Sequence, residues 1–238
     1  MKLDILAFGA HPDDVEISCG GTLLKYASQG KKIGIIDLTQ GELSTRGNIE
    51  LRAKESQKAS DFLGLTIREN LKMKDGFFDQ NESSIKSIIT KIRQYKPIVV
   101  MANSNSDRHP DHGRAGKLVE EACYYAGLEK IKTEISGVEQ EAYRPDLVLH
   151  YIQDYHIEPD ILFDISDFER KKLELIKCFS SQFYNPDSME PDTPISGEHF
   201  FDAIIGRLAT YGRSIGVNYA EGFNINRRFG VNDLFNLV

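Results

Sequence analysis

Short apolar runs alternate with stretches of helical periodicity along the first half of the chain. The apolar runs are typical of buried strands and comprise residues 3–10, 32–39, 66–73 and 97–103. The helical stretches comprise residues 20–30, a segment with Ala59, Phe62 and Leu63 at i, i+3, i+4 spacing, and residues 82–95 and 112–127. This alternation predicts an α/β, Rossmann-like fold in which helices cover both faces of a mostly parallel sheet.

The second half of the chain predicts two more strands and two more helices. In chain order these are a strand at 146–155, a strand at 160–166, a helix at 167–179 and a helix at 199–216. The two strands could pair antiparallel at an edge of the sheet. A loop rich in Pro, Asp and Ser precedes the last helix, and the sequence shows no repeat and no linker-like tract. We therefore expect one α/β domain over residues 1–238.

Polar clusters follow three of the predicted strands. The motif "HPDD" (11–14) follows the first strand, "QGE" (40–42) follows the second, and "HPDH" (109–112) lies just beyond the strand at 97–103. In an open parallel sheet, ligands bind beyond the carboxyl ends of the strands, where the loops of neighbouring units converge. We therefore expect the charged side chains of the first and third motifs to share one pocket: His11, Asp13, Asp14, His109, Asp111 and His112.

The residue types in these motifs are those of a catalytic metal site. Two histidines and one carboxylate, with a position left open for water, form a common catalytic zinc set. Pro12 stiffens the turn, so that His11 and Asp14 can face the same ion, and His112 would complete the set. A bound cation would also offset the cost of burying carboxylates.

The remaining members of the motifs are candidates for proton transfer. Asp13 would project toward the substrate side and is the candidate general base. His109 and Asp111 could act as an imidazole oriented by a carboxylate, which stabilises charge or moves a proton. Each motif alone has a simpler interpretation, since aspartates often cap helices and "HPDH" could be a surface turn. Two such motifs at one predicted sheet edge favour a functional site.

Composition narrows the class of ligand. The chain has 29 Lys and Arg against 36 Asp and Glu, a formal charge of −7, so it has no broad basic field for nucleic acid or anionic lipid. Its three cysteines show no CxxC spacing, which favours neither a disulfide framework nor a cysteine-rich zinc knuckle. The N-terminal residues predict neither a signal peptide nor a membrane span. We expect a cytoplasmic protein that acts on a small molecule.

Three stretches resemble the PIG-L/LmbE family of zinc-dependent N-acetylglucosamine deacetylases. They are "AFGAHPDDVEISCGGTL" (7–23), "LTQGELSTRG" (38–47) with Arg52 beyond it, and "DRHPDHGRAGKLV" (107–119). The stretch "TPISGEHFFDAIIGRLATYGRSIGVNYAEGF" (193–223) is similar to one branch, the N-acetylglucosaminyl-malate deacetylases of bacillithiol biosynthesis. The resemblance covers nearly the whole chain and implies the Rossmann-like fold of that family.

The resemblance also implies roles for individual residues. It places Zn²⁺, or another divalent ion such as Fe²⁺, at three ligands: His11, Asp14 and His112. It makes Asp13 the catalytic base, and it makes His109 with Asp111 the charge-stabilising pair. Arg52 would contact the substrate or the oxyanion. The resemblance further implies a homo-oligomer, since hexamers are common in the family.

An N-acetylglucosaminyl L-malate substrate would bring two carboxylates to an acidic protein. It would therefore need a local cationic patch, and arginine suits carboxylates because its planar fork donates two parallel hydrogen bonds. Arg108, beside the second histidine motif, is the first candidate, and the other candidates are Arg46, Arg114 and Arg213. The alternatives are a deacetylase or amidase for another N-acetylated sugar, a hydrolase of another bond such as an ester, and a non-catalytic sugar-binding protein.

Overall fold

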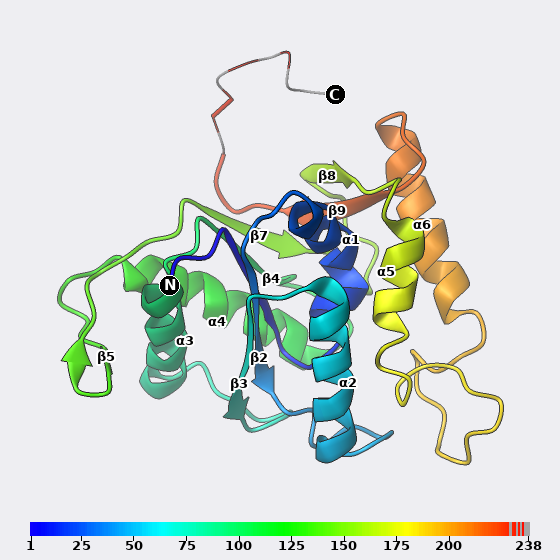
Figure 1. The fold of residues 1–238 in the computed structure, drawn as a ribbon, viewed down its shortest axis with the longest axis horizontal. Helices are drawn as coiled ribbons and strands as arrows, with labels where there is room; N and C mark the ends of the chain where they lie inside the picture. Colours follow the sequence, from blue (N-terminus) through cyan, green and yellow to red (C-terminus); the bar gives the residue numbers. More distant parts are fainter. Residues whose placement is uncertain (229, 232, 234, 236–238) are drawn as a thin grey trace.

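A seven-stranded sheet forms the centre of the structure, a computed structural model that describes residues 1–228, 230–231, 233 and 235. Its strands are β1 (Ile5–Gly9), β2 (Ile33–Thr39), β3 (Ile67–Met73), β4 (Val99–Asn103), β7 (Leu147–Tyr151), β8 (Ile161–Asp164) and β9 (Ala220–Asn224). The strand order is β3-β2-β1-β4-β7-β9-β8 (Figure 1). The first five strands in this order are parallel, and β9 and β8 add antiparallel pairings. A short hairpin lies outside this sheet and consists of β5 (Glu134–Ile135) and β6 (Val138–Glu139).

Helices cover both faces of the sheet. On one face lie α1 (Asp14–Ser28), α2 (Ile49–Leu63) and α5 (Glu169–Ile176), and on the other lie α3 (Glu82–Tyr95) and α4 (Pro110–Ala126) (Figure 1). The last helix, α6 (Phe200–Ser214), packs against β8 and β9. The predicted α/β, Rossmann-like fold is confirmed. In the part of the chain that the structure describes, no helix is long and apolar enough to cross a membrane.

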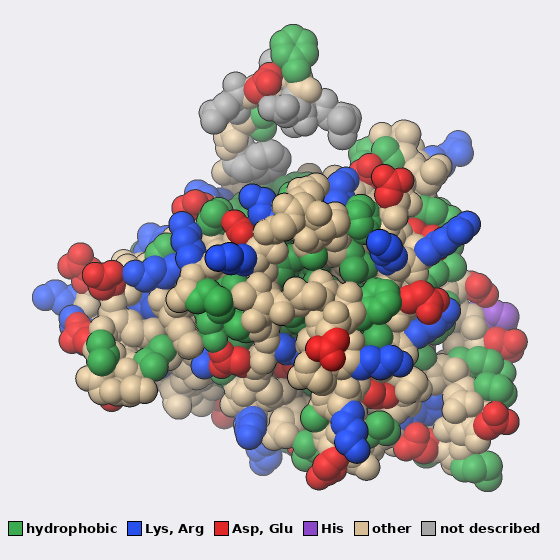
Figure 2. All heavy atoms as spheres, viewed as in Figure 1, with side chains coloured by type: hydrophobic (Ala, Val, Ile, Leu, Met, Phe, Trp, Pro, Cys, Tyr) green, Lys and Arg blue, Asp and Glu red, His purple; other side chains and the backbone are tan. Residues whose placement is uncertain are grey.

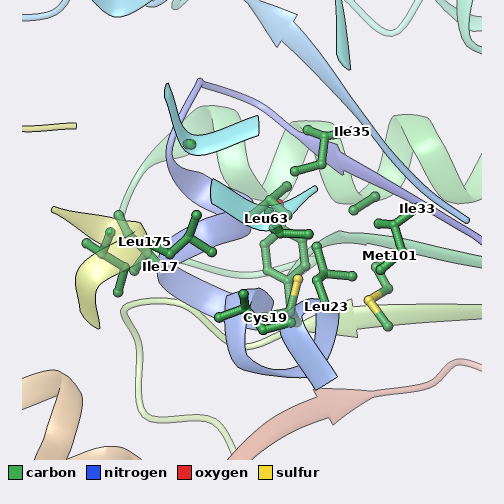
Figure 3. Packing of buried hydrophobic residues seen from close by; sticks show 14 of the residues in the cluster. Ile17, Cys19, Leu23, Ile33, Ile35, Leu63, Met101 and Leu175 are labelled. Atoms are coloured by element: carbon green, nitrogen blue, oxygen red, sulfur yellow. The ribbon is translucent and has the colours of Figure 1, made fainter. Parts of the chain in front are cut away.

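The side chains of β1 alternate between two hydrophobic cores. Ile5 and Ala7 pack in the core beneath α1, α2 and α5, while Leu6 and Phe8 pack in the core beneath α3 and α4. Figure 3 shows the first core, in which these side chains come from three helices and two strands: Ile17, Leu23, Leu63, Leu175, Ile33 and Met101. Packing on both faces fixes the central strands, and it thereby fixes the loops that leave their carboxyl ends.

Three local features differ from the sequence prediction. The helix predicted from residue 20 begins at Asp14, because the chain is helical on both sides of Cys19, whose φ of −129° and ψ of 17° kink α1. The strand predicted at 146–155 is shorter and runs parallel to β4, and β9 makes the antiparallel pairings of this edge. Neither β9 nor the β5–β6 hairpin was predicted. β9 has only five residues, with a glutamate and a glycine among them, so it shows no apolar run.

The surface carries charges of both signs. On the face shown in Figure 2, Lys and Arg side chains are interspersed with Asp and Glu side chains. This mixture fits the modest net charge of −7. Recognition of a charged ligand therefore depends on local groups in a cavity rather than on a long-range field.

Candidate metal and catalytic site

The loops that follow β1 and β4 meet where the strand order reverses. β1 lies between β2 and β4, and open α/β sheets bind ligands at such switch points. A cavity of about 300 Å³ opens there. Seven of the predicted site residues line this cavity: His11, Asp13, Asp14, Arg52, Arg108, His109 and His112. The structure thus brings the two histidine motifs together, as the sheet topology predicts.

Asp14 lies between the two histidines that the sequence predicts as metal ligands. Its carboxylate is 3.1 Å from His112 Nε2 and 3.6 Å from His11 Nδ1. Gln153 Nε2 and Asn103 Nδ2 donate hydrogen bonds to the same carboxylate. Burial raises the pKa of Asp14, but the charges and hydrogen bonds of the two imidazoles outweigh it and hold the pKa well below its usual range. The carboxylate is therefore ionised and fixed in place, as a metal ligand must be.

Two carboxylates outside the set of predicted site residues orient these imidazoles. Asp75 Oδ1 lies 3.0 Å from His11 Nε2, and Asp107 Oδ2 lies 2.7 Å from His112 Nδ1. Each histidine thus bonds to a carboxylate through one ring nitrogen and turns the other toward Asp14. Carboxylates in this position fix the tautomer and the orientation of metal-binding histidines. Asp75 follows β3 at the same edge of the sheet, which is the signal that could have identified it.

The spacing of these donor atoms suits a divalent ion. Ligands around tetrahedral zinc, with bonds of about 2.0–2.2 Å, lie about 3.4 Å apart. The separations of Asp14 from the two imidazoles bracket this value. Within the described residues, two groups of donor atoms lie within 4.8 Å of one another: His11, His109 and His112, and His11, Asp75 and Asp111. Imidazole and carboxylate are donor types that zinc and iron(II) accept, so the residues present fit a bound divalent ion.

Asp13 lies in the cavity with a strained backbone. Its φ of +122° belongs to the region that favours glycine. Only 5% of its surface is exposed, and Arg52 Nη2 donates hydrogen bonds to its carboxylate, over 3.2 Å, and to the Pro12 carbonyl. Burial raises the pKa of Asp13 to about 7, and the charge of Arg52 opposes that rise. A pKa near neutrality suits a general base.

The strained backbone of Asp13 is expected to lower the stability of the protein. We expect Asp13→Gly to be more stable than Asp13→Ala by about 1–3 kcal/mol, because both changes remove the carboxylate and only glycine adopts this φ without strain. Urea unfolding of the two metal-free variants at one pH measures the difference. Equal free energies of unfolding would show that the backbone at this position is not strained.

His109 and Asp111 lie side by side, but not as an imidazole oriented by a carboxylate. His109 caps α4, since its Nδ1 accepts the amide hydrogen of Asp111. The Asp111 carboxylate accepts hydrogen bonds from the Gly76 amide and from Arg114, and it lies 3.5 Å from His11 Nε2. The helix N-terminus turns the Asp111 amide, not its carboxylate, toward the His109 ring. Burial and the charges of neighbouring imidazoles lower the pKa of His109.

The candidate arginines differ in exposure and in partners. Arg52 is 3% exposed, and its bond to Asp13 makes it a support of the candidate base. Arg108 lines the cavity with 40% of its side chain exposed, and it pairs with Asp154 at the surface. The remaining candidates do not belong to the cavity lining: Arg46, Arg114 and Arg213. Arg52 and Arg108 thus both line the cavity, but of these two only Arg108 has an exposed side chain.

Comparison with known proteins relates the whole chain to a group of deacetylases. The family model for PIG-L, GlcNAc-PI de-N-acetylase, matches residues 6–123, which include both histidine motifs. Among solved structures, the conserved protein TT1542 from Thermus thermophilus is 32% identical, with a TM-score of 0.85 over 97% of this chain and 98% of that one. The diacetylchitobiose deacetylase of Thermococcus kodakarensis is 29% identical over 231 residues, or 92% of this chain and 81% of the relative.

More distant relatives differ in their named reactions. A probable N-acetyl-alpha-D-glucosaminyl L-malate deacetylase 2 from Bacillus anthracis is 23% identical over 192 residues, 75% of this chain and 81% of the relative. A 4-oxalmesaconate hydratase from Pseudomonas putida is 25% identical over 193 residues, 74% of this chain and 73% of the relative. These matches single out no substrate, so the malate branch stays a prediction. With the family model across both motifs and a 32% identical structure over nearly its full length, the chain belongs to the PIG-L family.

Proposed function

We propose that the protein is a metal-dependent deacetylase that hydrolyses the acetamide of an N-acetylated amino sugar. The observation that carries this proposal is one cavity in which two imidazoles, the Asp14 carboxylate and the Asp13 carboxylate lie together. A non-catalytic sugar-binding protein would need no buried base held in a strained backbone. The diacetylchitobiose deacetylase among the relatives supports the same class of reaction.

The proposed ligands of the ion are His11, Asp14 and His112. Both Zn²⁺ and Fe²⁺ accept this donor set. We favour Zn²⁺, because two histidines and one carboxylate form a common catalytic zinc set. The two donor groups that lie within 4.8 Å are less suitable. One has His109 in place of Asp14, and the His109 Nδ1 already accepts the Asp111 amide hydrogen. The other contains Asp111, whose carboxylate pairs with Arg114 and accepts the Gly76 amide hydrogen. When bound, the ion would polarise the acetamide carbonyl and increase the acidity of a water molecule.

The side chains of the cavity can carry the proton transfers that amide hydrolysis requires. Asp13 would accept a proton from the attacking water, and Arg52 would keep its carboxylate in position. The developing oxyanion needs a donor, and each such donor contributes about 3 kcal/mol to the stability of the transition state. The nitrogen must gain a proton before the C–N bond breaks. Protonated Asp13 and His109 are the two groups of the cavity proposed for that step.

The finer substrate hypothesis is N-acetylglucosaminyl L-malate. Arg108 supports it, because this guanidinium lies at the cavity and its pairing with Asp154 is a half-exposed surface contact. Surface ion pairs contribute only about 0–1 kcal/mol, so a substrate carboxylate could replace Asp154 at little cost. Of the four arginines that the sequence offers for malate, Arg108 is the one that lines the cavity.

Release of a primary amine from a small panel of substrates tests the proposed reaction. The panel consists of free N-acetylglucosamine, N,N′-diacetylchitobiose and N-acetylglucosaminyl L-malate. We expect hydrolysis of at least one member, loss of activity on chelation, and recovery with Zn²⁺ or Fe²⁺. If malate is recognised, kcat/KM for the malyl conjugate should exceed that for the free sugar by about tenfold or more. No amine release from any member, or full activity without metal, would contradict the proposal.

Arg108→Ala separates recognition of malate from the chemical step. It should lower kcat/KM for the malyl conjugate by about 10- to 100-fold, the effect of losing a charge-assisted hydrogen bond, and spare the free sugar. Arg213→Ala is the matched control, because it removes an exposed arginine that does not line the cavity. Equal efficiency of the unmodified enzyme on both substrates would exclude malate recognition and leave a deacetylase with another preference.

A further inference from the structure

One wall of the cavity comes from a stretch that forms neither helix nor strand. Thr193, Pro194 and Ile195 line the cavity, and they belong to the connection between α5 and α6. Among the hydrogen bonds of the described residues, none joins these three to a proposed metal ligand. The Thr193 hydroxyl is buried and has no hydrogen-bond partner among the described residues.

Arg46, in the loop after β2, holds this connection in place. The side chain is buried, with 3% of the residue exposed. Its guanidinium donates hydrogen bonds to the carbonyls of Phe183 (3.0 Å), Glu190 (3.4 Å) and Pro191 (2.8 Å). It also lies 3.4 Å from the exposed carboxylate of Asp192. A planar fork that meets three carbonyls is an arrangement that lysine cannot reproduce.

Close backbone contacts join the same two segments. The Gly47 amide donates a hydrogen bond to Glu190 Oε1 over 2.9 Å, and Gln182 Nε2 donates one to the Arg46 carbonyl over 2.8 Å. Gly47 has a φ of +73°, and a Cβ at this position would lie 2.9 Å from Ser181 Oγ. The loop after β2 and the connection before α6 therefore behave as one unit around the buried guanidinium.

We propose that Arg46 is a positioning residue that sets the affinity of the cavity for the part of the substrate beyond the N-acetyl group. The inference rests on the proposed deacetylase function. The acetamide must lie against the histidines and carboxylates, so the wall at 193–195 faces the remainder of the substrate. Because Arg46 is buried and does not line the cavity, it acts through this wall and not by binding the substrate.

Kinetics on a small and a larger substrate test this role. For the larger substrate that the wild type hydrolyses best, Arg46→Ala should raise KM by about tenfold. Its kcat, its metal content and its efficiency on free N-acetylglucosamine should stay within about twofold of wild type. The KM of Arg46→Lys should lie between those of the wild type and Arg46→Ala, because a lysine ammonium cannot meet all three carbonyls. Arg213→Ala removes the same charge from an exposed site and should match wild type.

Hydrogen exchange gives a result that does not depend on activity. Peptides from 183–195 should exchange about tenfold or more faster in Arg46→Ala than in wild type, while peptides from β1 should not change. Equal losses on both substrates, or unchanged exchange at 183–195, would overturn the proposal. If the wild type deacetylates no substrate, the proposed function fails separately. Faster exchange with weaker binding of N,N′-diacetylchitobiose would then support the positioning role, and unchanged binding would overturn it.

Discussion

Replacement of Asp13 by asparagine is expected to lower kcat by about 10²- to 10⁴-fold while the metal content stays at the wild-type level. The amide has the size of the carboxylate and still accepts a hydrogen bond from Arg52, but it cannot take a proton from water at neutral pH. In the wild type, Asp13 Oδ2 accepts a hydrogen bond from Arg52 Nη2, and Asp13 is not among the proposed metal ligands. The substitution should therefore leave the metal bound. Amine release at saturating substrate and metal analysis of the same preparation measure both quantities.

Asp14→Asn is the matched control for this experiment. It removes the same charge from the neighbouring buried residue, yet it should lose the metal together with turnover, because Asp14 lies between the two imidazoles. Near-normal kcat in Asp13→Asn would show that the base lies elsewhere, with His109 the next residue to test. Equal loss of metal in the two variants would show that Asp13 is itself a ligand.

The position of the site follows from the sequence because parallel strands have one carboxyl edge. The motifs after the first and fourth strands could be placed together once the order of strands and helices was recognised, without knowledge of any contact. The structure confirms the sheet and places His11, Asp14 and His112 at one cavity. Their exact partners are a different matter. Asp75 and Asp107 lie in loops that carry no repeating pattern, so only the folded chain shows which histidine each one orients.

Buried charges are the features that sequence patterns predict least well. Lys172 lies in the helical stretch "ERKKLELI" and would be expected at the surface, yet it is fully buried and donates hydrogen bonds to Glu221 and to the Ile17 carbonyl. Glu221 in turn accepts the amide hydrogen of Gly21, beyond the kink in α1. Such an arrangement joins three segments that are distant in sequence. Arg46, expected as a candidate for malate, is buried in a similar way, because its guanidinium donates hydrogen bonds to carbonyls of a segment that is distant in sequence.

Removal of a proposed metal ligand and removal of the carboxylate behind it are expected to weaken metal binding by different amounts. His112→Ala should lower the affinity by more than about 100-fold, and Asp107→Asn by about 10- to 100-fold. His112 would supply Nε2 to the ion, whereas Asp107 only orients the ring through Nδ1, over 2.7 Å. Competition with a chelator of known affinity, followed by metal analysis, measures both effects.

His199→Ala is the control for this comparison, because 87% of that side chain is exposed, and it should bind metal as the wild type does. Normal affinity in Asp107→Asn would limit this carboxylate to anchoring loops, since it also accepts the amide hydrogens of Asp154 and Tyr155. Normal affinity in His112→Ala would be more serious, because the ion would then belong to the second donor group. In that case Asp75→Asn, which removes a member of that group, should abolish binding, and the proposed ligand set would be wrong.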